Sequence, residues 1–314
     1  MAPRRIIIDT DPGQDDAFAI LLALGSPEEL EVVGVSTVAG NVPLERTTLN
    51  AQMVLELAGR ADIPVYPGCR RPMVRPLFTA EYVHGDSGLD GCDLPPPSAP
   101  LGAKHGVDFI IDTVMAADPG TITVCTLGPM TNLAMAIVKE PAIVARIREV
   151  VLMGGGFFEG GNTTPAAEFN IFVDPHAAHV VFSSGVPLTM VPIDCTYKAV
   201  MTPDWLRRLR AVGTETAVQA AGMAEFYQRY GNQKFGTDSY PLHDPCVMGF
   251  LLRPDLFQGR DCHVDIEIVS PVTTGMTVVD WWGVTKKPAN CLVLRDLDNP
   301  AFYDLMLERL SRLP

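Results

Sequence analysis

The segment that constrains this chain most lies near its N-terminus, where an aliphatic run leads into a cluster of acids. Residues 4–9 read RRIIID, and four carboxylates fall within eight positions: Asp9, Asp11, Asp15 and Asp16. The aliphatic run predicts a buried parallel strand, and the apolar residues 17–24 predict a core-facing helix. The acids therefore lie in the loop at the carboxyl end of a strand, where open α/β sheets bind their ligands. Because carboxylates this close repel one another, we expect a bound hard cation to compensate them.

Composition limits the kinds of partner that this 314-residue chain can have. Hydrophobic residues make up 47% and charged residues 19%, which is typical of a globular protein. The net charge of -13, with no Lys/Arg cluster longer than a pair, argues against a nucleic-acid partner. No apolar run reaches membrane-spanning length and no secretion signal precedes the first strand, so we expect a cytoplasmic protein without a membrane partner. The seven widely spaced cysteines favour reduced thiols.

Strand and helix signals alternate through the first half of the chain. We expect strands at 4–9, 31–36, 63–66, 121–126, 149–153 and 188–191, and helices at 15–24, 44–58, 107–117, 131–138 and 174–183. This alternation predicts an α/β fold with a mostly parallel, doubly wound (Rossmann-like) sheet. The C-terminal half adds predicted helices at 203–210, 215–230, 244–252 and 300–310 and a small antiparallel element from 264–270 and 276–280. No stretch has the composition of a flexible linker, so we expect a single domain, residues 1–314.

Polar residues also follow other predicted strands, in loops at 40–41, 127–132 and 153–170, and a further motif begins the helix at 244. In a doubly wound sheet these loops converge on one edge. They bring together Asp, Asn, Glu and backbone carbonyls with almost no cationic side chains. All-oxygen ligands suit Ca²⁺ or Mg²⁺ rather than Zn²⁺, and amides with carboxylates suit the hydroxyls of a sugar. The lack of Lys and Arg argues against a phosphate ligand.

Each of these residues also has a simpler explanation when it is taken alone. Asp15 would serve as a cap for the helix that follows, and His243-Asp244-Pro245 would be an ordinary helix start. The aromatic helix face around Tyr230 is more often core than ligand pocket. Four acids directly after an aliphatic strand, however, favour a functional site over capping alone.

Together the motifs resemble the inosine-uridine preferring nucleoside hydrolases, from about residue 4 to about residue 290. The matching segments are Asp9-Thr-Asp11-Pro-Gly-Gln-Asp15-Asp16, Gly40-Asn41, His84-Gly85, Gly128-Pro-Met-Thr-Asn132, Met153-Gly-Gly-Gly156, Glu168-Phe-Asn170 and His243-Asp244-Pro245. The resemblance implies hydrolysis of the N-glycosidic bond of ribonucleosides to free base and ribose, as in purine or pyrimidine salvage. It also implies a homodimer or homotetramer acting on a small-molecule ribonucleoside.

The resemblance further implies a calcium site and two catalytic residues. The ligands of one Ca²⁺ would be Asp11, Asp16, Asp244 and the backbone carbonyl of Leu127. Asp11 would also take the proton from a calcium-bound water. His243 would face the base as the acid for the leaving group, because a His with a pKa near neutrality suits protonation of a purine.

Substrate contacts are implied in the same way. Asp15 and Asn170 would hold the 2′- and 3′-hydroxyls of ribose with Asn41 nearby, and Asn162 and Glu168 would hold the 5′-hydroxyl. At the base, the resemblance implies contacts from His84, a substitute acid, and from Phe226 and Tyr230. That aromatic pair is similar to purine-accepting members, so we expect broad purine and pyrimidine specificity, including inosine and uridine.

Two alternatives remain open from the sequence. Asp9-Thr-Asp11 after an aliphatic strand also resembles the haloacid dehalogenase phosphatases, which need Mg²⁺. That family expects Thr or Val at the position of Gly13, and a later Lys that we do not find. The other alternative is a non-catalytic ribose- or Ca²⁺-binding protein of the same fold, which would bind ribose without turnover.

Overall fold

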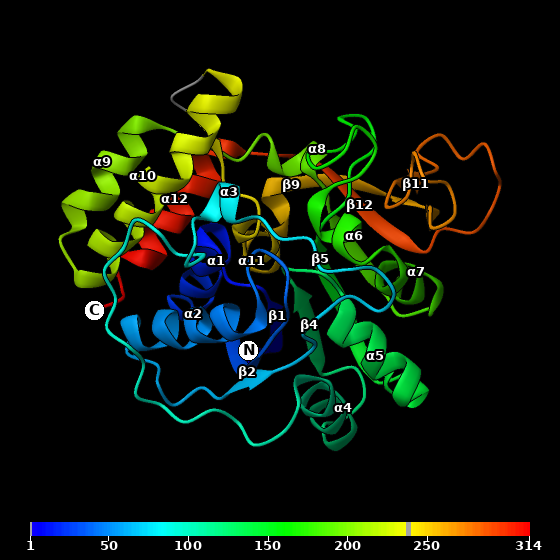
Figure 1. Cartoon of the computed structure of the whole chain (residues 1–314), viewed down its shortest axis with the longest axis horizontal. Coiled ribbons are helices and arrows are strands. Elements are labelled where there is room, and N and C mark those ends of the chain that lie inside the picture. The colour runs from blue at the N-terminus through cyan, green and yellow to red at the C-terminus, as the bar shows by residue number, and fades with distance from the viewer. Residues whose placement is uncertain (1, 237–239) are drawn as a thin grey trace.

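Eight strands form one sheet at the centre of the structure, a computed structural model that describes residues 2–236 and 240–314 (Figure 1). In spatial order the strands are β3 (Val65–Pro67), β2 (Leu30–Thr37), β1 (Arg4–Thr10), β4 (Ile122–Thr126), β5 (Ile147–Met153), β6 (Leu188–Val191), β12 (Cys291–Leu297) and β9 (Phe257–Cys262). All neighbours pair in parallel except β12 and β9, which are antiparallel. The mostly parallel, doubly wound sheet predicted from the sequence is confirmed.

The order of the strands creates one switch point. From β1 the chain proceeds outward to β2 and β3, and then returns to place β4 on the other side of β1. The loops that leave β1 and β4 therefore diverge, and open α/β sheets bind ligands in the crevice that such a divergence leaves. The acid cluster follows β1 and Leu127 follows β4, so both lie at this crevice.

Strand β1 is buried on both faces, which explains its unbroken aliphatic sequence. Ile6 and Ile8 belong to the core on one face of the sheet, and Ile7 belongs to the core on the other. All three side chains are fully buried, and burial of each contributes roughly 1.5–3 kcal/mol. A strand that alternated polar and apolar residues would leave a polar side chain in one of these cores.

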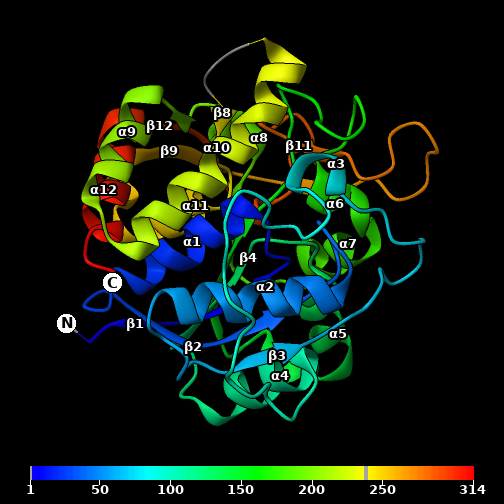
Figure 2. The same ribbon diagram turned by 60° about the vertical axis from the view of Figure 1, so that its left-hand side comes forward.

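Helices cover both faces of the sheet. The helices of the N-terminal part are α1 (Gln14–Leu24), α2 (Leu44–Leu57), α3 (Glu81–His84), α4 (Gly106–Ala116), α5 (Thr131–Lys139), α6 (Phe169–Val173), α7 (Pro175–Ser183) and α8 (Ile193–Thr196). The others are α9 (Pro203–Val212), α10 (Glu215–Phe235), α11 (Pro245–Leu252) and α12 (Asn299–Leu310), with short 3₁₀ turns at Pro141–Ile143 and Pro254–Leu256. Figure 2 shows α9 to α12 gathered beside α1.

The antiparallel element is present but shorter than predicted, as β10 (Val264–Ile266) and β11 (Thr277–Val279). A second small pair joins β7 (Val200–Met201) to β8 (Tyr240–Pro241). The expected end of α10 at residue 230 was wrong, because the helix continues for another turn and stops at Gly236, whose φ of 65° is left-handed.

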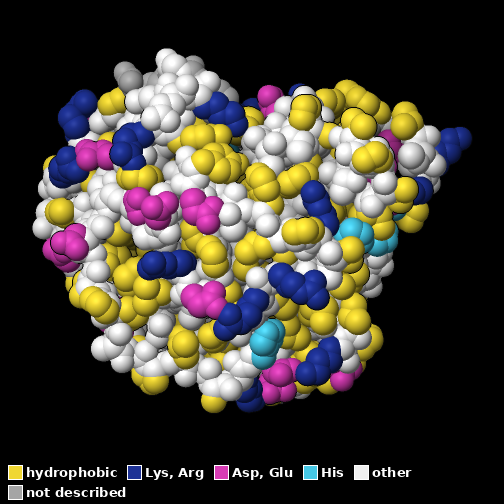
Figure 3. Space-filling model, viewed as in Figure 1, with side chains coloured by type: hydrophobic (Ala, Val, Ile, Leu, Met, Phe, Trp, Pro, Cys, Tyr) yellow, Lys and Arg dark blue, Asp and Glu magenta, His cyan; other side chains and the backbone are white. Residues whose placement is uncertain are grey.

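The surface carries charges of both signs. On the face in Figure 3, acidic and basic side chains are interspersed with hydrophobic ones. Among residues 2–236 and 240–314, every helix is either too short or too polar to traverse a lipid bilayer.

Candidate active site

One cavity at the carboxyl edge of the sheet collects most of the residues that the sequence singled out. Its lining includes Asp15, Asn41, His84, Leu127, Asn162, Glu168, Asn170, Tyr230, His243 and Asp244. Most of these residues come from loops and helix ends that are distant in sequence and that meet at this edge, and Tyr230 comes from α10. Asp11 and Asp16 lie just below this lining and are fully buried.

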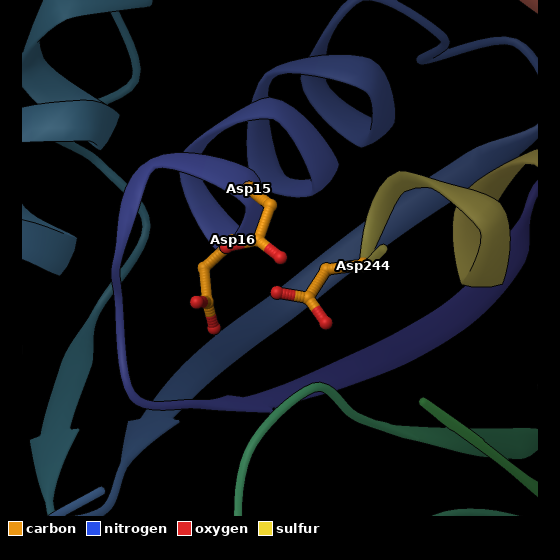
Figure 4. Close-up of side chains that lie close together, drawn as sticks. All are labelled: Asp15, Asp16 and Asp244. Carbon is orange, nitrogen blue, oxygen red and sulfur yellow. The ribbon is translucent and has the colours of Figure 1, made fainter. Parts of the chain in front are cut away.

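Two helix starts bring three carboxylates together. Asp15 and Asp16 lie in the first turn of α1, and Asp244 directly precedes α11, which packs against α1. Figure 4 shows the three side chains directed into one space. Among the His, Cys, Asp and Glu residues of the described chain, these three alone form a group that could hold a metal ion, with ligand oxygens all within 4.8 Å of one another.

Asp16 is the best supported of the three carboxylates. It accepts hydrogen bonds from the Thr10 hydroxyl, the Gly13 backbone N–H at 3.0 Å and the Asn41 side-chain amide at 3.2 Å. Its carboxylate also lies close to that of Asp244, with their ligand oxygens within 4.8 Å of each other. Two carboxylates this close repel each other, and a bound cation would offset that repulsion. Burial, and then repulsion from Asp15 and Asp16, raises the pKa of Asp244 well above its usual range.

Asp11 is held between two backbone segments. Its Oδ2 accepts the Asn41 backbone N–H at 2.7 Å. A Cβ at Gly40 or at Gly128 would overlap the Asp11 carboxylate, so both glycines are required by this close approach. Burial, followed by repulsion from Asp16, raises the pKa of Asp11 well above its usual value. The Asp11 side chain is therefore fixed in place next to other acids.

The acids fit a hard divalent cation. Asp11 Oδ1 and Asp15 Oδ1 are buried and have no hydrogen-bond partner within the described ranges. Every candidate ligand atom is an oxygen, which suits Ca²⁺ or Mg²⁺. The tight group contains Asp15, which was predicted to bind ribose, whereas the predicted ligand Asp11 lies outside it.

Two asparagines orient the groups around them. The Asn170 side-chain amide donates to the carbonyl oxygens of Leu127 at 2.6 Å and Met153 at 3.1 Å. Its own side-chain oxygen is therefore the atom able to accept a hydrogen bond from a ligand hydroxyl. The Asn41 amide donates to Asp16 and to the Asp11 backbone oxygen, so Asn41 supports the acid cluster directly.

Glu168 and Asn162 belong to the loop between β5 and α6. The Glu168 carboxylate caps α6, accepting from the backbone N–H groups of Asn170 and Ile171, and it also accepts from Gly155 at 2.9 Å. Burial nevertheless raises the pKa of Glu168 to about 7. The Asn162 side-chain oxygen accepts the Phe169 N–H at 2.9 Å, so its amide N–H₂ is the part able to donate to a ligand.

His243 is a buried residue of the cavity lining. Its Nδ1 lies 2.6 Å from the Thr196 hydroxyl. Burial lowers the pKa of His243 to about 4, so the imidazole is neutral near pH 7. The expectation of a His with a pKa near neutrality was therefore wrong. If Thr196 donates to Nδ1, the neutral ring carries its proton on Nε2 and can donate a hydrogen bond.

The protonation of His84 follows from its neighbour. The Gln14 side-chain N–H₂ donates to the carbonyl oxygens of His84 and Asp90, so the Gln14 oxygen is the atom that faces His84 Nδ1 at 2.7 Å. That oxygen can only accept, which assigns the proton of the neutral ring to Nδ1. Burial lowers the pKa of His84 to about 3. His84 therefore presents an acceptor at Nε2, which argues against it as a substitute acid.

Tyrosines form the rest of the wall, and one aromatic prediction needs correction. Five of the seven tyrosines line the cavity, at positions 82, 197, 227, 230 and 240. Phe226 is not among the lining residues, because it lies about 100° around the helix from Tyr227. The Phe226 ring instead packs under the Arg229 guanidinium, 3.5 Å away. The buried Tyr227 takes its place, with its hydroxyl 3.3 Å from Asp15 Oδ2 and its ring stacked on His84.

Known proteins are similar to this chain in sequence and in fold. The family model described as inosine-uridine preferring nucleoside hydrolase matches residues 6–304. An inosine-uridine preferring nucleoside hydrolase of Leishmania major is 42% identical over 99% of this chain and 98% of its own length. A pyrimidine-specific ribonucleoside hydrolase, RihA, of Shewanella sp. (strain ANA-3) is 44% identical over 98% and 96%. A solved purine-preferring ribonucleoside hydrolase from Gardnerella vaginalis superimposes with a TM-score of 0.91, at 32% identity over 98% of both chains.

Proposed function

Because the chain belongs to the inosine-uridine preferring nucleoside hydrolase family, we propose that the cavity described above is where it cleaves ribonucleosides. The protein is a ribonucleoside hydrolase, which releases free base and ribose. The observation that carries the assignment of the site is the group of Asp15, Asp16 and Asp244 at the floor of an amide-rich cavity. The phosphatase alternative receives no support, since the matching family model spans nearly the whole chain.

A release assay tests this function directly. We expect the purified protein to liberate free base from inosine and uridine, measured by chromatography, and to leave nucleoside monophosphates intact. Binding of ribose without any release of base would instead favour the non-catalytic alternative.

We propose Ca²⁺ as the cation, held by Asp16, Asp244, Asp11 and the Leu127 carbonyl, with Asp15 close enough to take part. A divalent cation at this position would lower the pKa of a water molecule and neutralise the acids. Asp11, whose Oδ1 has no other partner in the described chain, would accept a proton from the attacking water. The surrounding negative charge would favour a ribosyl group that becomes cationic in the transition state.

Removal of the metal should abolish activity and lower stability. Purified protein is expected to contain about one Ca²⁺ per chain by elemental analysis. After chelation, Tm should fall, because a ligand present at 100 times its Kd stabilises the folded state by about 2.7 kcal/mol. Restoring Ca²⁺ should recover both activity and Tm. Stoichiometric zinc, or full activity after exhaustive chelation, would contradict the assignment.

For the sugar, we propose that Asp15 and Asn170 bind the 2′- and 3′-hydroxyls, with Asn41 orienting the acids. Asn162 and Glu168 would bind the 5′-hydroxyl from the loop after β5. The fixed hydrogen bonds leave the Asn162 N–H₂ and the Asn170 side-chain oxygen available to a ligand, which suits a sugar that presents several hydroxyls.

For the base, we propose that His243 donates a hydrogen bond or proton to the leaving group. His243→Ala should slow hydrolysis of inosine by about 10²–10⁴-fold. Hydrolysis of p-nitrophenyl riboside should change far less, because its leaving group departs without a proton. Steady-state kinetics on both substrates test this role. An equal loss of rate on the two substrates would show that His243 is a structural residue.

The lining of the cavity also bears on which bases the enzyme accepts. The tyrosine wall offers aromatic faces to either kind of base, and the relatives include a pyrimidine-specific and a purine-preferring hydrolase. We therefore propose broad purine and pyrimidine activity. We further propose a cytoplasmic, single-domain protein that forms a homodimer or homotetramer, which light scattering on the purified protein would test.

A further inference from the structure

Asp194 lies outside the cavity lining and outside every motif that the sequence singled out. It belongs to the short helix α8, which follows β6 at the carboxyl edge of the sheet, and it is 3% exposed. Its carboxylate accepts three consecutive backbone N–H groups: Phe157 at 2.9 Å, Phe158 at 2.8 Å and Glu159 at 3.1 Å. No other hydrogen bond of the Asp194 side chain is seen in the described chain, so the carboxylate is committed to this turn.

The turn begins the loop that joins β5 to α6, next to α8 in Figure 1. Three residues beyond Glu159 the same loop carries Asn162, and it ends at Glu168. Thr277 of β11 holds the residue before the turn, because its hydroxyl binds both the N–H and the carbonyl of Gly156, at 2.9 and 2.6 Å. The start of the loop is thus attached to the body of the protein through Thr277 and Asp194.

A carboxylate suits this position for a physical reason. Three adjacent N–H groups that point the same way find no partner in a strand or helix, and each would be costly to leave unsatisfied. One carboxylate supplies two oxygens that accept all three. An Asn at this position would keep the oxygen that faces Phe158 and Glu159, but would present its own N–H₂ to the Phe157 N–H.

We propose that Asp194 is a positioning residue for recognition of the 5′ end of the ribose. It fixes the turn at residues 157–159 and thereby sets the position of Asn162 relative to Glu168. The inference rests on the proposed role of Asn162 and Glu168 at the 5′-hydroxyl. Asp194 itself does not touch the substrate.

The test compares inosine with 5′-deoxyinosine in the wild type and in Asp194→Asn and Asp194→Ala. Wild-type enzyme should prefer inosine by about 10-fold to 100-fold in kcat/KM, as expected for hydrogen bonds that involve a charged partner. Asp194→Ala should lose most of this preference. In this variant inosine loses its 5′-hydroxyl contact, whereas 5′-deoxyinosine does not make that contact in any of the proteins. Asp194→Asn, which has the same shape, should retain an intermediate preference.

Hydrogen exchange gives a second readout in the same proteins. The amides of residues 157–159 should exchange faster in both variants than in the wild type, while the α1 amides should be unchanged. Glu56→Ala is the matched control, since the Glu56 carboxylate also accepts two consecutive loop N–H groups, those of Ser98 and Ala99 at 2.7 Å each, and none of these residues lines the cavity. That variant should keep the wild-type substrate preference.

The results distinguish an error in the proposed 5′-hydroxyl contacts from an error in the role of Asp194. If wild-type enzyme hydrolyses inosine and 5′-deoxyinosine equally well, the proposed 5′-hydroxyl contacts are wrong. The positioning role of Asp194 is then overturned as well. If the wild type discriminates but the Asp194 variants lose activity on both substrates equally, only the inference about Asp194 is overturned. An unchanged preference in Asp194→Asn, together with unchanged exchange at residues 157–159, would overturn it as well.

Discussion

The enzyme is expected to hydrolyse 2′-deoxyinosine with a kcat/KM about 10⁴-fold below that for inosine. The reason lies in the buried polar atoms at the floor of the cavity. Asp15 is 5% exposed, and its Oδ1 has no hydrogen-bond partner in the part of the chain that the structure describes. Burial, followed by repulsion from Asp16, raises the pKa of Asp15 to about 7. A ribose hydroxyl that donates to Asp15 Oδ1 gives this buried oxygen a hydrogen-bond partner. A substrate without that hydroxyl leaves the oxygen unpaired, which is unfavourable.

The measurement is a comparison of kcat/KM for the two substrates under identical calcium saturation. Uridine and 2′-deoxyuridine form a matched pair that separates the effect of the sugar from that of the base. In Asp15→Ala the two sugars should become nearly equivalent, since the group that distinguishes them is gone. Equal kcat/KM for inosine and 2′-deoxyinosine in the wild-type enzyme would rule out Asp15 as a ribose ligand.

Much of the fold could be predicted because the decisive signals are local. A strand buried on both faces needs an unbroken aliphatic run, and Ile6, Ile7 and Ile8 supply it. Alternation of strands and helices then implies a parallel sheet with its loops at one edge. The strands β9 and β12 were not predicted. In β9 the four central residues are exposed at the sheet edge, so its sequence has neither an aliphatic run nor regular alternation.

The phase of α10 could not be predicted, because contacts distant in sequence determine it. A Cβ at Gly222 would overlap the carbonyl oxygen of Gly91, and a Cβ at Gly231 would overlap the Tyr240 ring. These two glycines lie about 180° apart around the helix, so they allow close approach on opposite sides of it, and Tyr227 shares the side of Gly231. Periodicity alone indicates which residues share a face, but not which face is turned inward.

The pKa values of His84 and His243 could not be predicted from the sequence either. Residue type gives His243 an ordinary pKa, and only the folded structure supplies the burial that lowers it to about 4. Asp194 and Thr196 could not be found in advance for a similar reason. Neither lies in a motif, and each acts on a partner that is brought close only by folding, a loop in one case and His243 in the other.

Asp11→Asn is expected to lower kcat by about 10²–10⁴-fold, the range typical for loss of a general base. The geometry makes this substitution a clean one. Asp11 Oδ2 accepts the Asn41 backbone N–H. An Asn at position 11 must therefore place its oxygen at this point, because its N–H₂ there would face the Asn41 N–H, donor against donor. Its N–H₂ then occupies the place of Oδ1, the oxygen without a partner among the described residues. The substitution therefore replaces the proposed proton acceptor by a donor without changing the shape of the side chain.

The same substitution should stabilise the metal-free protein. Folding raises the pKa of Asp11, so the folded state binds the proton more tightly, and the wild type loses stability as pH rises above the unfolded pKa of about 4. A neutral Asn removes this loss. In chelator at pH 7, Asp11→Asn should therefore melt above the wild type, with the difference shrinking as pH approaches 4. Calcium should raise Tm less in the variant, if Asp11 is a ligand. A near-normal kcat in a variant that still binds calcium would mean that another residue accepts the proton.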